Sequence, residues 1–177
     1  MAKPIVTLKA SVASKATPEQ VYAVLADPST HAQWAGSDAP SKVFALLDVE
    51  APEGRAGAGT TFTSRGTNGK KAVFHDRNVV TEAIAPHRFA FETQSHLVRA
   101  HRKAWDAKFV HRYDIVKDGA ATRVDYRCDV FPQNYRPYWL HPLMRPMTRL
   151  MVPKMVLKNM RNLARAAEKT TAVERSG

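Results

Sequence analysis

The chain has 177 residues, 44% of them hydrophobic and 24% charged, and a formal net charge of +11, a composition that excludes an intrinsically disordered chain and fits one globular core. Cys128 is the only cysteine, which excludes an intrachain disulfide, and no apolar run approaches the ~20 residues that a membrane-spanning helix requires. We therefore expect one cytoplasmic domain over residues 1–177, with an ordered core at about 5–168 and a flexible tail at 169–177.

The first half of the chain predicts a strand, two short helices and then several more strands. Residues alternate in polarity from Ile5 to Ser14, as in a half-buried strand. Thr17 is a good N-cap for a helix with Pro18 at its first position, and a second short helix is expected from Pro28 to Trp34. Turn residues delimit further strands at 42–49, 60–66, 71–85 and 88–93, and the stretch 94–104 is expected to be a loop.

The dipeptide Asp118-Gly119 predicts a β-hairpin, because it lies between two runs of alternating polarity. Centring the turn on this dipeptide pairs His111 with Tyr126 and Asp114 with Arg123. The aromatic face is expected to point into the protein and the charged face to water. A shift by one residue would exchange the two faces, so the pattern specifies the register.

A long C-terminal helix is expected from about Leu140 or Pro142 to Glu168, with Pro153 inside it. Its apolar stripes before and after Pro153 are out of phase, which predicts a kink or break at this proline. Basic residues form a separate stripe along the second segment, which we call the basic stripe: Lys154, Lys158, Arg161 and Arg165.

Three segments resemble a known superfamily. They are Thr17–Pro28 with the downstream Trp34, the pair Val80–Ala83 and Pro86–Phe91, and Asn159–Glu168. All three are similar to the SRPBCC or START-like superfamily, most nearly to its polyketide cyclase/dehydrase and lipid-transport branch. The resemblance implies an α+β helix-grip fold: a curved antiparallel sheet of about seven strands wrapped around a long C-terminal helix, two short helices after the first strand, and a pocket between sheet and helix.

Side chains expected to face this pocket are mostly aromatic or sulfur-containing, which suits an apolar ligand. His111, Tyr113 and Tyr126 are the candidates for proton transfer, since histidine titrates near neutral pH and a tyrosine hydroxyl can polarise a carbonyl. The alternative for His111 is a buried, hydrogen-bonded histidine that orients a ligand or completes the core. The predicted ligand-binding residues are Trp34, Phe89, Phe91, Trp105, Phe109, His111, Tyr113, Tyr126, Cys128, Met147, Met151 and Met155.

Three functions fit these expectations. The first is binding, or transport, of a hydrophobic or aromatic small molecule, and the second is a cofactor-independent polyketide-type cyclase or dehydratase using the same pocket. The third is a basic protein that contacts an anionic membrane through the basic stripe. No metal, cofactor or nucleic-acid partner is expected. The histidines lack the spacing of metal ligands, and His75-Asp76 is interpreted as a polar pair within a strand. Cys128 has no basic neighbour that would stabilise a thiolate. The sequence favours no oligomeric state.

Overall fold

The computed structural model describes residues 3–35, 45–67, 72–99, 104–133 and 145–174. For residues 132, 145–151 and 171–174 it describes the backbone only. The elements are β1 (Val6–Ser14), α1 (Pro18–Ala26), the 3-10 helix η1 (Pro28–Thr30), α2 (His31–Trp34), β2 (Ala45–Glu50), β3 (Thr61–Thr67), β4 (Ala72–Ile84), β5 (Arg88–Arg99), β6 (Trp105–Asp118), β7 (Ala121–Pro132) and α3 (Arg145–Glu174).

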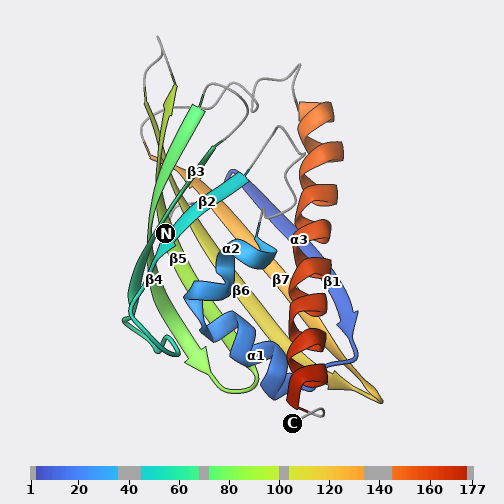
Figure 1. The fold of residues 1–177 in the computed structure, drawn as a ribbon. Coiled ribbons are helices and arrows are strands. Elements are labelled where there is room, and N and C mark those ends of the chain that lie inside the picture. The colour runs from blue at the N-terminus through green and yellow to red at the C-terminus, as the bar shows by residue number, and fades with distance from the viewer. Residues whose placement is uncertain (1–2, 36–44, 68–71, 100–103, 134–144, 175–177) are drawn as a thin grey trace.

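All the strands belong to one antiparallel sheet of seven strands in the order β1-β7-β6-β5-β4-β3-β2. The sheet curves, and α3 lies against its concave face, with α1 and α2 at one end between the two (Figure 1). Val156, Met160 and Leu163 from α3 join residues of the concave face, such as Phe89 and Val124, in one buried core. This is the α+β arrangement expected from the sequence, which the structure confirms.

The predicted start of α1 is confirmed in detail. Thr17 Oγ1 accepts a hydrogen bond from the Gln20 amide at 3.4 Å, and Gln20 Oε1 accepts one from the Thr17 amide at 2.9 Å. This reciprocal capping box satisfies backbone donors that the first turn cannot pair internally. It stabilises the N-terminus of α1, the helix that precedes η1 and α2 in the chain.

The expectation of a loop at 94–104 is wrong for its first half, because β5 continues to Arg99. Thr93 and Ser95 are buried while Gln94 and His96 are exposed, so the alternation of a strand persists. Strand β5 pairs with β4 on one side and β6 on the other. Two long neighbours thus supply backbone partners for a segment whose polar sequence alone does not indicate a strand.

The hairpin joins β6 and β7 as predicted, but its register is different. Asp118 pairs with Ala121, and Gly119, with φ 61°, is the first loop residue. A two-residue turn of this kind needs positive φ at that first position, which glycine adopts without strain. His111 therefore lies opposite Cys128, and Tyr126 lies opposite Tyr113. The shift relative to the expected pairing is even, so each side chain keeps its predicted face.

The new register also corrects the expected charge pairs on the outer face. Asp114 lies opposite Asp125, not opposite Arg123. Asp114 instead accepts from Arg88 Nε at 2.5 Å, while Arg123 Nε lies 3.0 Å from Asp125 on its own strand. Like charges that face each other across β6 and β7 are thus compensated by other neighbours.

Helix α3 differs from the expectation at both Pro153 and its end. It runs through Pro153 without a break (Figure 1). Pro153 is exposed, whereas Val152 packs against the core and Val156 is buried, so packing holds the helix on both sides of the proline. The helix ends at Glu174, beyond the predicted end at Glu168. Ala, Glu and Lys around Glu168 are strong helix formers, and no glycine or proline stops the helix there.

Candidate functional site

Aromatic and histidine rings cluster on the concave face where α2 meets the sheet. His31 stacks on Trp34 with ring centroids 4.7 Å apart, and His111 stacks on Phe91 at 4.5 Å. His31 also meets Phe91 edge-on at 5.7 Å, and Trp34 meets Tyr113 edge-on at 6.1 Å. The short helix α2 therefore places a second histidine beside His111, which the sequence analysis did not predict.

His111 and Tyr126 form the polar part of this cluster. Their side chains point inward from β6 and β7, and the imidazole Nδ1 lies 2.9 Å from the Tyr126 hydroxyl oxygen. The predicted proximity of the two residues is confirmed, although they are not directly opposite in the sheet. Both side chains are only half-buried.

Burial sets the protonation states of this pair. It lowers the pKa of His111 to about 3, with a smaller contribution from His31, and it lowers the pKa of His31 to about 4. Burial also raises the pKa of Tyr126 and of Tyr113. At neutral pH both imidazoles are therefore uncharged and both phenols are protonated. The pair can exchange hydrogen bonds with a neutral polar group, but His111 is too weak a base for efficient general base catalysis near pH 7.

A second group of polar side chains lies on the concave face of β3, β4 and β5. We call it the inner polar cluster: Ser64, Asp76, Asn78, Thr93 and Ser95. Thr93 Oγ1 donates to Asn78 Oδ1 at 2.6 Å, and Asn78 Nδ2 lies 3.3 Å from both the Phe62 carbonyl oxygen and Ser64 Oγ. Both the oxygen and the nitrogen of the Asn78 amide therefore form hydrogen bonds within the protein.

Asp76 is the exception in this cluster. Burial raises its pKa to about 6, an effect that a hydrogen bond from Ser95 partly offsets. Its Oδ1 atom is buried and has no hydrogen-bond partner among the described residues. His75 is exposed on the outer face, so the two residues do not form the polar pair expected from the sequence. The alternation of β4, with Phe74 and Asn78 inward, is the signal that would have placed Asp76 inside.

The predicted ligand-binding residues of the sheet that the structure describes lie on its inward face, Trp34 of α2 belongs to the core, and Met155 lies on α3 next to the buried Val156. Phe109, His111, Tyr126 and Met155 are half-buried. The fully buried ones are Trp34, Phe89, Phe91, Trp105, Tyr113 and Cys128. The side chains of Met147 and Met151 lie outside the described residues. Ligand contact by this set remains a prediction.

Cys128 is buried, and burial raises the pKa of its thiol to about 12. The thiol is therefore protonated at neutral pH and unsuited to nucleophilic catalysis. Within the described ranges, no three or more His, Cys, Asp or Glu side chains are placed to hold a metal ion. None of the helices in those ranges is long and apolar enough to cross a membrane.

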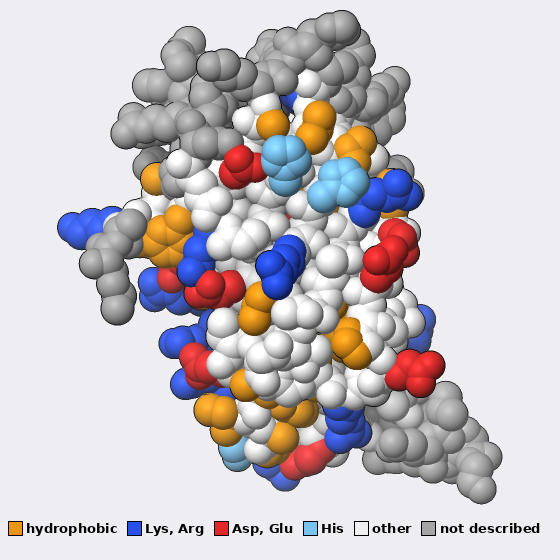
Figure 2. All heavy atoms as spheres, turned by 90° about the vertical axis from the view of Figure 1, so that its left-hand side faces the viewer, with side chains coloured by type: hydrophobic (Ala, Val, Ile, Leu, Met, Phe, Trp, Pro, Cys, Tyr) orange, Lys and Arg blue, Asp and Glu red, His pale blue; other side chains and the backbone are white. Residues whose placement is uncertain are grey.

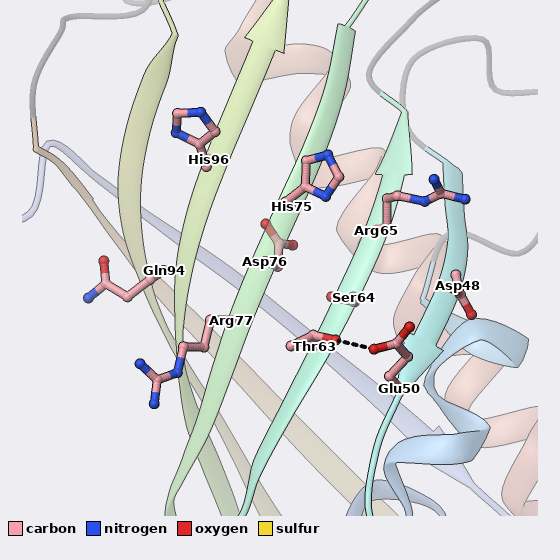
Figure 3. A pocket seen from close by; sticks show the side chains of 10 residues that line it. All are labelled: Asp48, Glu50, Thr63, Ser64, Arg65, His75, Asp76, Arg77, Gln94 and His96. Atoms are coloured by element: carbon pink, nitrogen blue, oxygen red, sulfur yellow. Dashed lines mark hydrogen bonds between the residues drawn. The ribbon is translucent and has the colours of Figure 1, made fainter.

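The outer face of the sheet carries a hollow of about 640 Å³. Charged and histidine side chains are scattered over this face (Figure 2), and those around the hollow come from β2 to β5 (Figure 3). His75 and His96 lie on neighbouring strands beside it, with Arg65, Asp48 and Glu50 on the other side. Asp76 and Ser64 of the inner polar cluster also line this hollow. Its walls mix both signs of charge, so this hollow does not suit an apolar ligand.

Comparisons with known proteins identify relatives in fold. A family model described as polyketide cyclase / dehydrase and lipid transport matches residues 6–168. A conserved protein from Geobacillus kaustophilus superposes with a TM-score of 0.66 at 13% identity, covering 93% of this chain and 97% of that chain. Protein CV1439 from Chromobacterium violaceum gives 0.59 at 16% identity, covering 92% and 96%. DynU16, a protein of the dynemicin biosynthetic locus, gives 0.52 at 15% identity, covering 93% and 48%. No curated protein matches the sequence.

Proposed function

Because the chain belongs to the polyketide cyclase/dehydrase and lipid transport family, we propose that it binds an apolar or aromatic small molecule between the concave face of the sheet and α3. The polar end of this ligand meets the His111–Tyr126 pair. The proposal is narrower than the family assignment, because a shared fold does not fix a function.

The observation that carries the proposal is the exposure of side chains that point inward. Phe109, His111 and Tyr126 lie on the concave face, and Met155 lies on α3, yet all four are only half-buried. In a closely packed core such residues would be covered by their neighbours. Large apolar side chains around one neutral polar pair are the composition typical of a small-molecule site.

The chemistry of the pair favours a neutral polar group on the ligand. An uncharged imidazole next to a protonated phenol can donate one hydrogen bond and accept another, but it offers no charge to attract a carboxylate or an amine. A carbonyl or a hydroxyl group satisfies this site best.

The first test replaces Tyr126 with phenylalanine, which removes the hydroxyl and keeps the ring. We expect Tyr126→Phe to weaken binding of 9-anthraldehyde about five- to tenfold, as the loss of one hydrogen bond implies. Binding of 9-methylanthracene, which has no carbonyl, should change less than about twofold on the same grounds. Fluorescence titration measures both affinities.

The matched control is Tyr22→Phe, because Tyr22 is a buried tyrosine on α1 that has no hydrogen bond with His111. It should leave both affinities unchanged. Equal losses for the aldehyde and the hydrocarbon in Tyr126→Phe would contradict a polar role for the pair.

A cyclase or dehydratase using the same site is the second candidate. The family description includes these activities, and the structural neighbour DynU16 comes from a biosynthetic locus. In such an enzyme Tyr126 would polarise a substrate carbonyl and His111 would take a proton from the adjacent carbon. The lowered pKa of His111 makes it a poor proton acceptor at neutral pH, which favours binding over catalysis.

We also propose that the basic stripe contacts anionic membrane surfaces. Its four residues are exposed on α3, spaced so that they share one side of the helix. Lys154, Arg161 and Arg165 form no ion pair with any described residue, whereas sheet residues such as Arg88 and Arg112 are paired with acidic neighbours. Three cations without an ion pair to a described residue, Lys154, Arg161 and Arg165, on the helix that covers the ligand site suit loading from a lipid surface.

A further inference from the structure

The inner polar cluster contains one group whose hydrogen-bonding capacity the protein does not use. Thr93, Asn78 and Ser64 bond to one another or to backbone, as described above. Asp76 Oδ1 is buried and, within the described ranges, receives no hydrogen bond. Buried polar atoms are almost always paired, so this oxygen needs a specific explanation.

The neighbours of Asp76 on the concave face of the adjacent strands have short side chains. In the sheet register, Asp76 lies between Ser64 on β3 and Ser95 on β5, and Ala107 on β6 continues the row. These three side chains are among the shortest, so none of them reaches over the carboxylate. The Asp76 residue as a whole is only half-buried, although its Oδ1 atom is fully covered.

We propose that Asp76 accepts a hydrogen bond from a hydroxyl or amino group at one end of an elongated ligand whose other end meets the His111–Tyr126 pair. This inference rests on the proposed function and deepens it, since it defines the shape and polarity of the ligand. An ionised carboxylate only accepts hydrogen bonds, so a donor is required and an anionic group is excluded at this end.

The register sets the length of such a ligand. Asp76 on β4 lies level with Ala107 on β6, with β5 between them. His111 lies farther along β6 than Ala107. With strands about 4.8 Å apart and a rise of about 3.3 Å per residue, the two Cα positions are about 16 Å apart. A rigid molecule of two aromatic rings joined by a short bridge, with a hydrogen bond at each end, spans this distance.

The raised pKa of Asp76 is consistent with this role. Burial disfavours the charged carboxylate in the free protein, and a donor from the ligand would restore part of the lost solvation. Replacing Asp76 by an apolar residue of similar size should therefore not destabilise the fold. Loss of binding in such a variant then reports on ligand contact.

The test compares trans-4,4′-dihydroxystilbene with trans-4,4′-dimethoxystilbene. These probes are fluorescent, differ only in hydrogen-bond donation, and carry the same group at both ends, so either orientation presents it to Asp76. The wild-type protein should prefer the dihydroxy compound. Asp76→Leu should reduce that preference at least about tenfold, as expected for a hydrogen bond to a charged group, and leave affinity for the dimethoxy compound within about twofold.

The matched control is Asp48→Leu, which removes an exposed carboxylate on the outer side of the hollow that Asp76 also lines. It should preserve the preference. A preference that survives in Asp76→Leu overturns the inference while the proposed function stands. A preference lost in Asp48→Leu places the probe in the outer hollow and overturns the inference. Failure of wild-type protein to bind either stilbene contradicts the proposed function itself, and the inference with it.

Discussion

Lowering the pH from 6.5 to about 4 is expected to reduce the free energy of unfolding by a net of about 2 kcal/mol, because the destabilisation from His31 and His111 exceeds the opposite effect of Asp76. Burial lowers the pKa of His31 to about 4 and that of His111 to about 3, whereas both have ordinary values when unfolded. In this pH window the unfolded chain therefore binds more protons than the folded one, so acid favours unfolding. Each pKa unit corresponds to about 1.4 kcal/mol, and we reduce the total because both residues are partly exposed.

Asp76 acts in the opposite direction. Burial raises its pKa from 3.8 to about 6, so between these values the folded state binds more protons and stability falls as the pH rises. The opposite effect of one carboxyl group cancels only part of the effect of two histidines. The free energy of unfolding should therefore still increase overall as the pH rises. Asp76 still takes up protons for about one pH unit above its folded pKa, so the slope should come from the histidines alone among these three groups only from about pH 7.

Urea unfolding at a series of pH values measures this dependence. The double variant His31→Phe/His111→Phe should lose most of the acid sensitivity, since phenylalanine keeps a ring at each position and takes up no proton. The control double variant His75→Phe/His87→Phe, which alters exposed histidines, should retain it. An equal pH slope in the wild type and in His31→Phe/His111→Phe would show that these two histidines are not buried in neutral form.

Reversing two charges of the basic stripe is expected to weaken membrane binding strongly. A Lys or Arg near an anionic surface contributes about 1 kcal/mol, so Arg161→Glu/Arg165→Glu should lower partitioning onto phosphatidylserine-containing vesicles at least about tenfold. Co-sedimentation with vesicles, with pure phosphatidylcholine vesicles for comparison, measures the change. Added salt should weaken the wild-type interaction.

The control has the same change in net charge on the opposite side of the molecule. Arg65→Glu/Arg77→Glu alters exposed residues of the outer sheet face. It should reduce partitioning only slightly, because these side chains are not on α3. Equal losses in both double variants would attribute binding to net charge and contradict a membrane-facing helix.

Local sequence signals predicted most of the fold. The Thr17 cap and the alternation in β1, β4 and β6 depend on neighbouring residues, and the structure has these elements where they were expected. The second half of β5 could not be predicted in this way, because its strand is stabilised by pairing with β4 and β6. The continuity of α3 through Pro153 likewise depends on packing of Val152 and Val156 against the core.

The candidate site was only partly predictable. Alternation along β6 and β7 was sufficient to place His111 and Tyr126 on one face, even though the turn position and the exact pairing were wrong. His31 could not be found from local pattern, because its place in the cluster comes from its contact with Phe91 across the fold. Alternation along β4 was enough to place Asp76 inside, but the unpaired Oδ1 atom of its carboxylate depends on the neighbouring strands. The sheet register, which brings such residues together, depends on the whole sheet.

Nuclear Overhauser effects between protein and ligand can test whether the ligand lies between the concave face and α3, as we propose. With isotopically labelled protein and trans-4,4′-dimethoxystilbene, we expect contacts from the probe to the Met155 methyl group and to the rings of Phe109 and Tyr126. Contacts to His75 and His96, which border the outer hollow, would contradict it. So would a saturated complex in which none of the three inward-facing residues contacts the probe.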